Sequence, residues 1–253
     1  MDPSTAIRAG HLAGTLRSLV TYHGVPFRQA RLRALLRQFV PPRALVFDLG
    51  AHVGNRVRAS RRLGARVVAV EPQPRFAAFL RGAFARDPGV EVIEAAVGAA
   101  PGRARLWISD RHPTVTTLSA EWRMRVARHP AFARVRWNRA IEVEVTTLDA
   151  LIARFGEPAF VKIDVEGSES AVLDGLSRPL AALSFECVPA AIDDAKRCVD
   201  RLESLASYRY NWSLGETMRL GAPQWIDADA IKAWLGSARA RSRPGDIYAR
   251  CVS

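Results

Sequence analysis

The chain has 253 residues, and its 37 Lys and Arg against 25 Asp and Glu give a formal net charge of +12. The composition, 49% hydrophobic and 25% charged, is that of a globular protein and excludes a disordered, collagen-like or disulfide-stapled chain. A chain of this length can bury about three-quarters of the surface that it exposes when unfolded, which predicts one good-sized domain.

Short apolar runs alternate with longer segments of helical period, a pattern that predicts an α/β fold with a doubly wound, mostly parallel sheet. Residues 1–43 precede the first run and are expected to form an N-terminal helical cover over the sheet edge. The segments between the runs are long enough for the helices of right-handed crossovers. The runs that predict strands are 44–50, 66–72, 90–95, 159–167 and 181–186.

Residues 100–157 interrupt this alternation, and we interpret them as an insertion after the third strand of the main domain, which spans 44–253. Three tryptophans fall in or near the insertion and are expected to form a small core of its own: Trp107, Trp122 and Trp137.

Beyond the fifth run, apolar residues at steps of three and four predict a helix over 190–206. Two further strand-like segments, 208–216 and 246–253, are expected to close the sheet as an antiparallel pair.

Four of the five runs end in an acidic residue: Asp48, Glu71, Asp164 and Glu186. Ligands of open parallel sheets bind at the carboxyl ends of the strands, so these four side chains are expected to converge on one crevice. A buried carboxylate without a partner is costly, and a cleft in which it binds a ligand relieves that cost.

The turn after the first run has two glycines four residues apart, Gly50 and Gly54, with His52 between them and Asn55 after them. Glycines allow a sharp bend and the close approach of a ligand. The spacing differs from the G-x-G-x-x-G of dinucleotide sites, which disfavours a pyrophosphate. Glu71 ends the next run, followed by Pro72, and an acid there can accept both hydroxyls of a ribose. A nucleoside with a charged amino-acid tail, as in S-adenosylmethionine, fits this pattern.

The fourth strand carries a lysine, Lys162, that must reach water or find a carboxylate such as Asp164. Asp164 and Glu166 are interpreted as site residues. For Glu169, a helix-capping role and a site role are equally open. His52 and His112 are both candidates for a general base, although a histidine in a loop is more often a local hydrogen-bonding residue.

Several features bear on partners and location. The three cysteines show neither a disulfide framework nor zinc-ligand spacing, and no membrane span or signal peptide is evident, so a cytoplasmic location is expected. Thirty-four of the 37 basic residues are arginines, since only Lys162, Lys196 and Lys232 are lysines. They are scattered as on a solvated face, which favours a small-molecule partner over a nucleic acid. The sequence does not indicate the oligomeric state.

The sequence resembles the FkbM-type methyltransferases, a branch of the class I S-adenosylmethionine-dependent enzymes. The resemblance is carried, in family order between about residues 45 and 186, by VFDLGAHVGN, VVAVEPQP, AAVG, TTLDALI, VKIDVEGSE and ALSFE. It implies a Rossmann-like, seven-stranded sheet with a reversed last strand, and O-methylation of a hydroxyl on a sugar, glycan or polyketide-like molecule. His52 departs from the asparagine that the family often has.

By position, the resemblance implies that Asp48, Gly50 and Gly54 contact the methionine part of S-adenosylmethionine and that Glu71 contacts the ribose. Ala96 and Val97 would lie near the adenine. His52, Asn55 and Pro72 complete the expected cofactor site.

Asp164 and Glu166 would face the methyl group and the acceptor, with one of them as the base and His112 in reserve. A divalent metal held by Asp164 and Glu186 is permitted by these acids without being required. Two alternatives stay open. One is a methyltransferase acting on RNA or another nucleic acid, and the other is a nucleoside-binding module without catalysis.

Overall fold

A seven-stranded sheet organises the part of the chain that the structure, a computed structural model, describes: residues 28–252. The strand order is β3-β2-β1-β7-β8-β10-β9, and β10 is antiparallel to both of its neighbours while the other pairs within β3-β2-β1-β7-β8 are parallel. The expected reversed last strand is therefore present. The strands are β1 (Leu45–Leu49), β2 (Arg66–Val70), β3 (Val90–Ile93), β7 (Phe160–Ile163), β8 (Ala182–Cys187), β9 (Tyr208–Leu214) and β10 (Gly245–Cys251).

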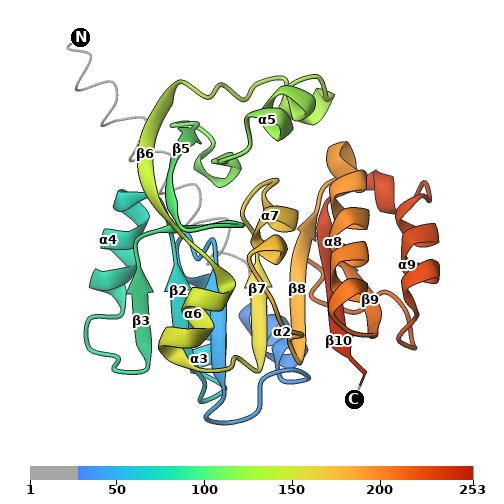
Figure 1. Cartoon of the computed structure of the whole chain (residues 1–253), viewed down its shortest axis with the longest axis horizontal. Helices are drawn as coiled ribbons and strands as arrows, with labels where there is room; N and C mark the ends of the chain where they lie inside the picture. The colour runs from blue at the N-terminus through green and yellow to red at the C-terminus, as the bar shows by residue number, and fades with distance from the viewer. Residues whose placement is uncertain (1–27, 253) are drawn as a thin grey trace.

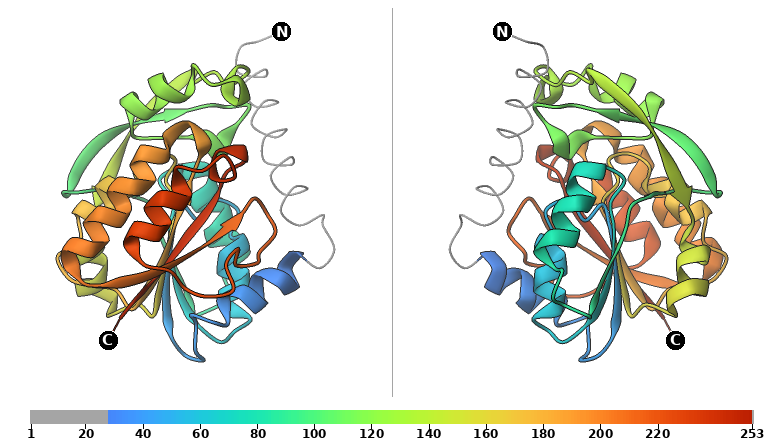
Figure 2. Two further views of the ribbon diagram at one scale, coloured as in Figure 1. Left: turned by 90° about the vertical axis from the view of Figure 1, so that its right-hand side faces the viewer. Right: turned by 90° about the vertical axis from the view of Figure 1, so that its left-hand side faces the viewer.

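Helices cover both faces of this sheet, as Figure 2 shows from the two sides. One face packs against α2 (Arg28–Leu36), α3 (Asn55–Arg61) and α4 (Pro74–Ala83), and the other against α6 (Leu148–Phe155), α7 (Glu169–Asp174), α8 (Ile192–Leu205) and α9 (Ala228–Leu235). Both faces of β1 are buried, which explains why its sequence is a continuous apolar run interrupted only by Asp48.

The expected N-terminal cover is described only in part, because residues 1–27 lie outside the described residues. In the described part, α2 buries Leu32, Leu35 and Leu36 in a cluster that also contains Val57 of α3 and Val46 of β1. No helix among residues 28–252 is long and apolar enough to span a membrane.

The insertion forms a second, three-stranded sheet of order β4-β6-β5, which lies above the carboxyl ends of the parallel strands (Figure 1). Its elements are β4 (Ala96–Val97), β5 (Gly102–Ile108), η1 (Pro113–Val115), α5 (Ala120–Val126), η2 (Pro130–Phe132) and β6 (Arg139–Thr146). Ser119 and Thr147 cap α5 and α6 with their side-chain oxygens.

Helix α6 falls within the segment 100–157 that the sequence analysis assigned to the insertion. In the structure, Leu148, Leu151 and Ile152 of α6 pack into the core of the main sheet. This helix is thus the crossover that leads into β7, and the insertion proper ends with β6.

Two short 3-10 helices complete the described part, η3 (Pro189–Ala191) and η4 (Ala240–Ser242). The expected antiparallel pair is present as β9 and β10, which are hydrogen-bonded from Gly245 opposite Leu214 to Cys251 opposite Tyr208. The helix expected over 190–206 is η3 followed by α8.

Candidate cofactor site

A cavity lies at the carboxyl ends of β1, β2 and β7, beneath the insertion. The space between its walls, open solvent at the mouth included, is about 900 Å³. The main sheet and the insertion both contribute to its wall. The residues named from the sequence that line it are Asp48, Gly50, His52, Asn55, Glu71, Pro72, Ala96, Val97, Asp164 and Glu166.

The two ends of this cavity differ in chemistry. The end near β4 is apolar, with Val97 and the insertion residues Leu106, Pro113 and Leu118 in its wall. The end near β1 and β7 carries Asp48, Arg56, Asp164 and Glu166. Such a cavity suits an elongated ligand that is apolar at one end and charged at the other.

Gly50 allows the turns after β1 and β7 to approach each other closely. Its φ of +82° lies in the left-handed region, and a Cβ built on it would stand 1.9 Å from the carbonyl oxygen of Asp164. Asp164 in turn donates its backbone N–H to the carbonyl of Leu49, at 3.0 Å. The glycine therefore brings Asp48 and Asp164 to one place.

Gly54 does not line the cavity, although the sequence analysis expected it to contact the cofactor. It precedes α3 with a φ of +75°, and a Cβ there would stand 2.8 Å from side-chain atoms of Leu80 and Phe84. Gly54 thus allows the start of α3 to pack against α4. The two glycines thus serve different purposes: Gly50 allows the close approach of the turn after β7, and Gly54 allows α3 to pack on α4.

Glu71 is buried at the end of β2, with 2% of its surface exposed. One carboxylate oxygen accepts the backbone N–H of His52 and the other that of Gln73, both at 2.9 Å. Burial raises the pKa of Glu71 to about 7, although these two hydrogen bonds favour the charged form. Each oxygen keeps a lone pair for a further donor, as two ribose hydroxyls require.

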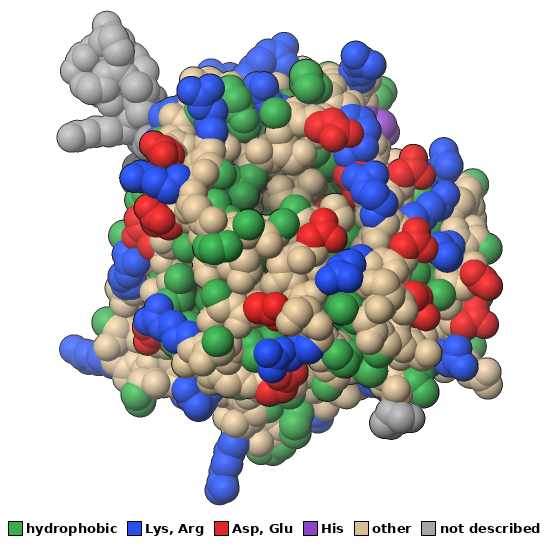
Figure 3. Space-filling model, in the orientation of Figure 1, with side chains coloured by type: hydrophobic (Ala, Val, Ile, Leu, Met, Phe, Trp, Pro, Cys, Tyr) green, Lys and Arg blue, Asp and Glu red, His purple; other side chains and the backbone are tan. Residues whose placement is uncertain are grey.

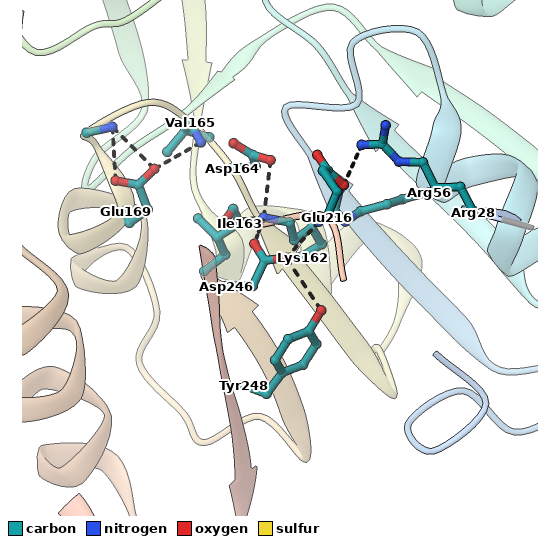
Figure 4. Close-up of polar contacts among 11 residues, drawn as sticks. Arg28, Arg56, Lys162, Ile163, Asp164, Val165, Glu169, Glu216, Asp246 and Tyr248 are labelled. Carbon is teal, nitrogen blue, oxygen red and sulfur yellow. Dashed lines mark hydrogen bonds and ion pairs between the residues drawn. The ribbon is translucent and has the colours of Figure 1, made fainter. Parts of the chain in front are cut away.

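Buried charged groups lie at the floor of the charged end on β1, β7 and β10, and Figure 4 shows those of β7 and β10. Asp48 stands beside Lys162 in the register of β1 and β7. The ammonium of Lys162 lies 2.9 Å from Asp246 Oδ1 of β10 and 3.2 Å from Asp164 Oδ2. Asp246 also accepts a hydrogen bond from Arg56 Nη2, at 2.8 Å.

These contacts decide which of these groups stay charged. Burial raises the pKa of Asp48 to about 6, against the opposing attraction of Arg56 and Lys162. For Asp246, Lys162 and Arg56 outweigh burial and hold the pKa of its carboxyl below the usual range. Burial acts to lower the pKa of Lys162, but the charges of Asp164 and Asp246 raise it overall. Lys162 and Asp246 are thus an ion pair inside the protein.

Three carboxylates meet at the charged end of the cavity, although Glu186, expected in the crevice, does not line it: Asp164, Glu166 and Glu186 each offer an oxygen within 4.8 Å of the others. Burial, then the charges of Glu186 and Asp164, raises the pKa of Glu166 well above its ordinary value. The pKa of Glu186 is raised in the same way by burial and by Asp164. Oxygen ligands of this kind could hold a divalent cation. Lys162 already offsets the charge of Asp164, so the arrangement does not require one.

Glu169 holds the turn that presents these acids. Its carboxylate accepts the backbone N–H groups of Val165 and Gly167 (Figure 4). Because these bonds fix the turn from Asp164 to Gly167, and because Glu169 does not line the cavity, the structure places it as a support of the site rather than a member.

The two candidate histidines differ in position. His52 lines the cavity with its ring against Phe76, and burial lowers its pKa to about 4, so its imidazole is neutral at physiological pH. His112 does not line the cavity, although the next two residues, Pro113 and Thr114, do. The structure thus places the reserve base beside the site and not within its wall.

The insertion is fastened to the turn after β7 by Trp122 of α5. Its indole packs so closely on Gly167 that a Cβ there would stand 2.1 Å from the ring. Trp122 also meets Trp137 and Phe132 edge to face. Trp107 is not part of this cluster. The guanidinium groups of Arg105 and Arg123 lie over its ring.

Two charged residues were not predicted from the sequence: Arg56, which lines the cavity, and Asp246, which lies beneath it. Arg56 follows the glycine turn directly, and its charge next to Asn55 was a signal that could have been used. Asp246 gave no local signal, because its place beside Lys162 depends on the register of β10 against β8.

The Methyltransferase FkbM domain matches residues 48–192, more than half of the chain. This protein belongs to that family. It is an S-adenosylmethionine-dependent methyltransferase, and S-adenosylmethionine is its cofactor. Among curated proteins, none matches the chain.

The solved structures to which the chain is similar include methyltransferases of several kinds. They include an O-methyltransferase from Bacillus cereus in complex with SAH, with 14% identity and a TM-score of 0.46, covering 98% of this chain and 91% of that one. The precorrin-6y C5,15-methyltransferase from Geobacter metallireducens has 14% identity and a TM-score of 0.45, covering 88% and 86%. Fibrillarin from Aeropyrum pernix with natively bound S-adenosyl-L-methionine has 11% identity and a TM-score of 0.46, covering 86% and 72%.

The cavity fits the cofactor of this family. Its apolar end suits a purine, and the buried carboxylate of Glu71 carries the free acceptor sites that a ribose needs. The charged end suits an amino-acid tail and a sulfonium. When bound, the cofactor would supply an electrophilic methyl group.

Proposed function

We propose that the protein methylates a hydroxyl group of a small molecule or glycan, such as a sugar or polyketide-like acceptor. The observation that carries the proposal is the pair of carboxylates, Asp164 and Glu166, at the charged end of the cofactor cavity. An alcohol must lose a proton when its oxygen is methylated, and a positioned carboxylate can accept that proton.

The two carboxylates are suited to this role in different ways. Lys162 holds Asp164 in place from below, so this carboxylate is fixed toward the cavity. Burial and the neighbouring charges raise the pKa of Glu166, which makes its ionised form a stronger base than an ordinary glutamate. The acceptor oxygen would bond to the methyl carbon as the carbon–sulfur bond breaks and its electron pair stays on sulfur. The hydroxyl proton would pass to Asp164 or Glu166.

Positioning of the acceptor beside the cofactor also contributes to the expected rate of methyl transfer. Aligning the acceptor oxygen with the methyl group can supply up to about 7–11 kcal/mol. The insertion residues Leu106, Pro113, Thr114 and Leu118 line the cavity on its upper side. They would exclude water from the reacting groups.

The test is transfer of a labelled methyl group from S-adenosylmethionine to a panel of sugars, glycans and macrolides. RNA belongs in the panel because basic side chains gather over the insertion at the top of Figure 3. Incorporation into a hydroxyl of a small molecule or glycan is expected. Incorporation into RNA alone would overturn the acceptor class.

Asp164→Asn and Glu166→Gln test the base. At least one of them is expected to lower turnover about 10²–10⁴-fold without an equal loss of cofactor affinity. The exposed Glu157→Gln is the matched control. Full turnover in both site variants would disprove a carboxylate base. A loss of activity in EDTA that Mg²⁺ restores would assign these acids to a metal instead.

A further inference from the structure

The charged end of the cavity carries carboxylates in excess. Asp48, Glu71, Asp164 and Glu166 line the cavity, and Arg56 is the one Lys or Arg side chain among the described residues that do so. The cofactor itself bears a carboxylate on its methionine part, beside an ammonium group. That carboxylate needs a cation, because charged groups without a partner are costly in a partly buried site.

Arg56 is positioned to present donors to the cavity. It is the second residue of α3, and its side chain is 18% exposed. Its Nη2 donates to Asp246 Oδ2, at 2.8 Å, and Asp246 is fixed in turn by Lys162 (Figure 4). A guanidinium has five N–H donors. The bond to Asp246 uses one donor and anchors the group.

The position of Arg56 along the cavity also agrees with the polarity of the cofactor. The apolar end near Val97 suits the adenine, and Glu71 suits the ribose. The amino-acid tail is then left at the end where Asp48, Arg56 and Asp164 lie. The two aspartates suit the ammonium and sulfonium groups, and the guanidinium suits the carboxylate.

We propose that Arg56 binds the carboxylate of the cofactor's methionine part and that it thereby selects ligands that carry this group. The inference rests on the cofactor of the proposed function and assigns one of its contacts. Arginine can bind a carboxylate through two parallel hydrogen bonds, which a lysine cannot reproduce. The buried anchor on Asp246 reduces the freedom that the side chain loses on binding.

The experiment compares ligands that differ by the carboxylate alone. Isothermal titration measures the Kd of S-adenosylmethionine and of decarboxylated S-adenosylmethionine for the wild type, Arg56→Met and Arg56→Lys. We expect the wild type to bind the intact cofactor about 10- to 100-fold more tightly than the decarboxylated one. In Arg56→Met the ratio of the two Kd values, decarboxylated over intact cofactor, should fall to within about threefold of one. Arg56→Lys should give an intermediate ratio.

Two controls separate recognition from support of the fold. Arg62→Met removes an exposed arginine at the end of the same helix and should leave the ratio unchanged. 5′-Methylthioadenosine lacks the whole amino-acid tail, so its Kd should change less than about threefold in Arg56→Met, and its binding reports that the variant is folded.

Three results would overturn the proposal: a wild type that does not distinguish the two ligands, an Arg56→Met variant that keeps the full ratio, or an equal loss for all three ligands. A wild type that shows the expected ratio but methylates no hydroxyl would overturn the proposed function alone. Absence of binding by any ligand to the wild type would overturn both.

Discussion

The ammonium of Lys162 lies 2.9 Å from Oδ1 of Asp246, although the strands that carry the two residues, β7 and β10, are not neighbours in the sheet. The contact passes across β8, where Ser184 stands between Lys162 and Tyr248 in the register. A single buried pair thus connects the turn that bears Asp164 to the strand that anchors Arg56. Changes to this pair should affect both stability and cofactor binding.

Lys162→Met is expected to lower the free energy of unfolding by about 3–5 kcal/mol, because it leaves Asp246 and Asp164 without their shared cation. Adding Asp246→Asn should restore part of this loss, since one of the two carboxylates that shared Lys162 is then neutral, while Arg56 can still donate to the amide oxygen. Urea denaturation of the two single variants and the double variant measures the coupling. The partly exposed Lys196→Met serves as the control. Additive losses in the double variant would contradict the pairing.

Asp48→Asn should stabilise the ligand-free protein more at high pH than at low pH. Burial raises the folded-state pKa of Asp48 from 3.8 to about 6, so its contribution to stability is present below 3.8 and is lost as the pH rises through 6. The variant does not undergo this loss. The difference in free energy of unfolding between Asp48→Asn and the wild type, measured by urea denaturation, should therefore grow by about 1 kcal/mol between pH 5 and pH 8. A difference that stays constant with pH would show that Asp48 titrates normally.

Gly50→Ala should abolish cofactor binding and lower stability, because the added Cβ would meet the carbonyl oxygen of Asp164 at 1.9 Å. That oxygen belongs to backbone and cannot swing away. Gly82→Ala is the matched control, since a Cβ at this position of α4 meets nothing within 4 Å. It should raise stability by up to about 1 kcal/mol. Thermal unfolding with and without S-adenosylmethionine measures both effects, and normal binding by Gly50→Ala would refute the close approach.

Trp122→Ala should loosen the insertion from the turn after β7. The indole is 1% exposed and packs on Gly167, so its loss should cost about 3–5 kcal/mol if the insertion unfolds together with the main domain. Met124→Ala on the same helix removes a side chain that is 60% exposed and should be nearly neutral. Limited proteolysis shows whether cleavage within 109–138 becomes faster in Trp122→Ala alone. Equal cleavage rates in the two variants would contradict the role of Trp122.

The sequence carried enough information for the sheet and for most of the cavity wall, for a physical reason. A parallel strand that is buried on both faces has an almost continuously apolar sequence. An acidic residue at its end, such as Asp48 or Glu71, therefore stands out in the sequence. Because parallel strands end at one edge, these acids could be placed together without knowledge of the register.

The remaining contacts depend on geometry that no local pattern encodes. The sequence analysis paired Lys162 with Asp164, two residues along the same strand, and that contact is present. The shorter contact with Asp246, 84 residues away, requires the antiparallel register of β10 and could not be predicted. Likewise, the interpretation of Gly54 as a cofactor contact followed from its spacing to Gly50. Gly54 does not line the cavity, and a Cβ built on it would meet Leu80 and Phe84, a packing that depends on where α4 lies.

The position of β10 between β8 and β9 has a consequence for the order in which the protein can be assembled. In the chain β10 follows every other strand of the sheet, so the edges of β8 and β9 that pair with it are without their partner until it is synthesised. Their unpaired edges are open to other chains until β10 enters. Because Asp246 belongs to β10, Arg56 can donate a hydrogen bond to it only after this strand has entered the sheet. The proposed carboxylate contact of Arg56 and the protection of these strand edges are therefore expected to arise together.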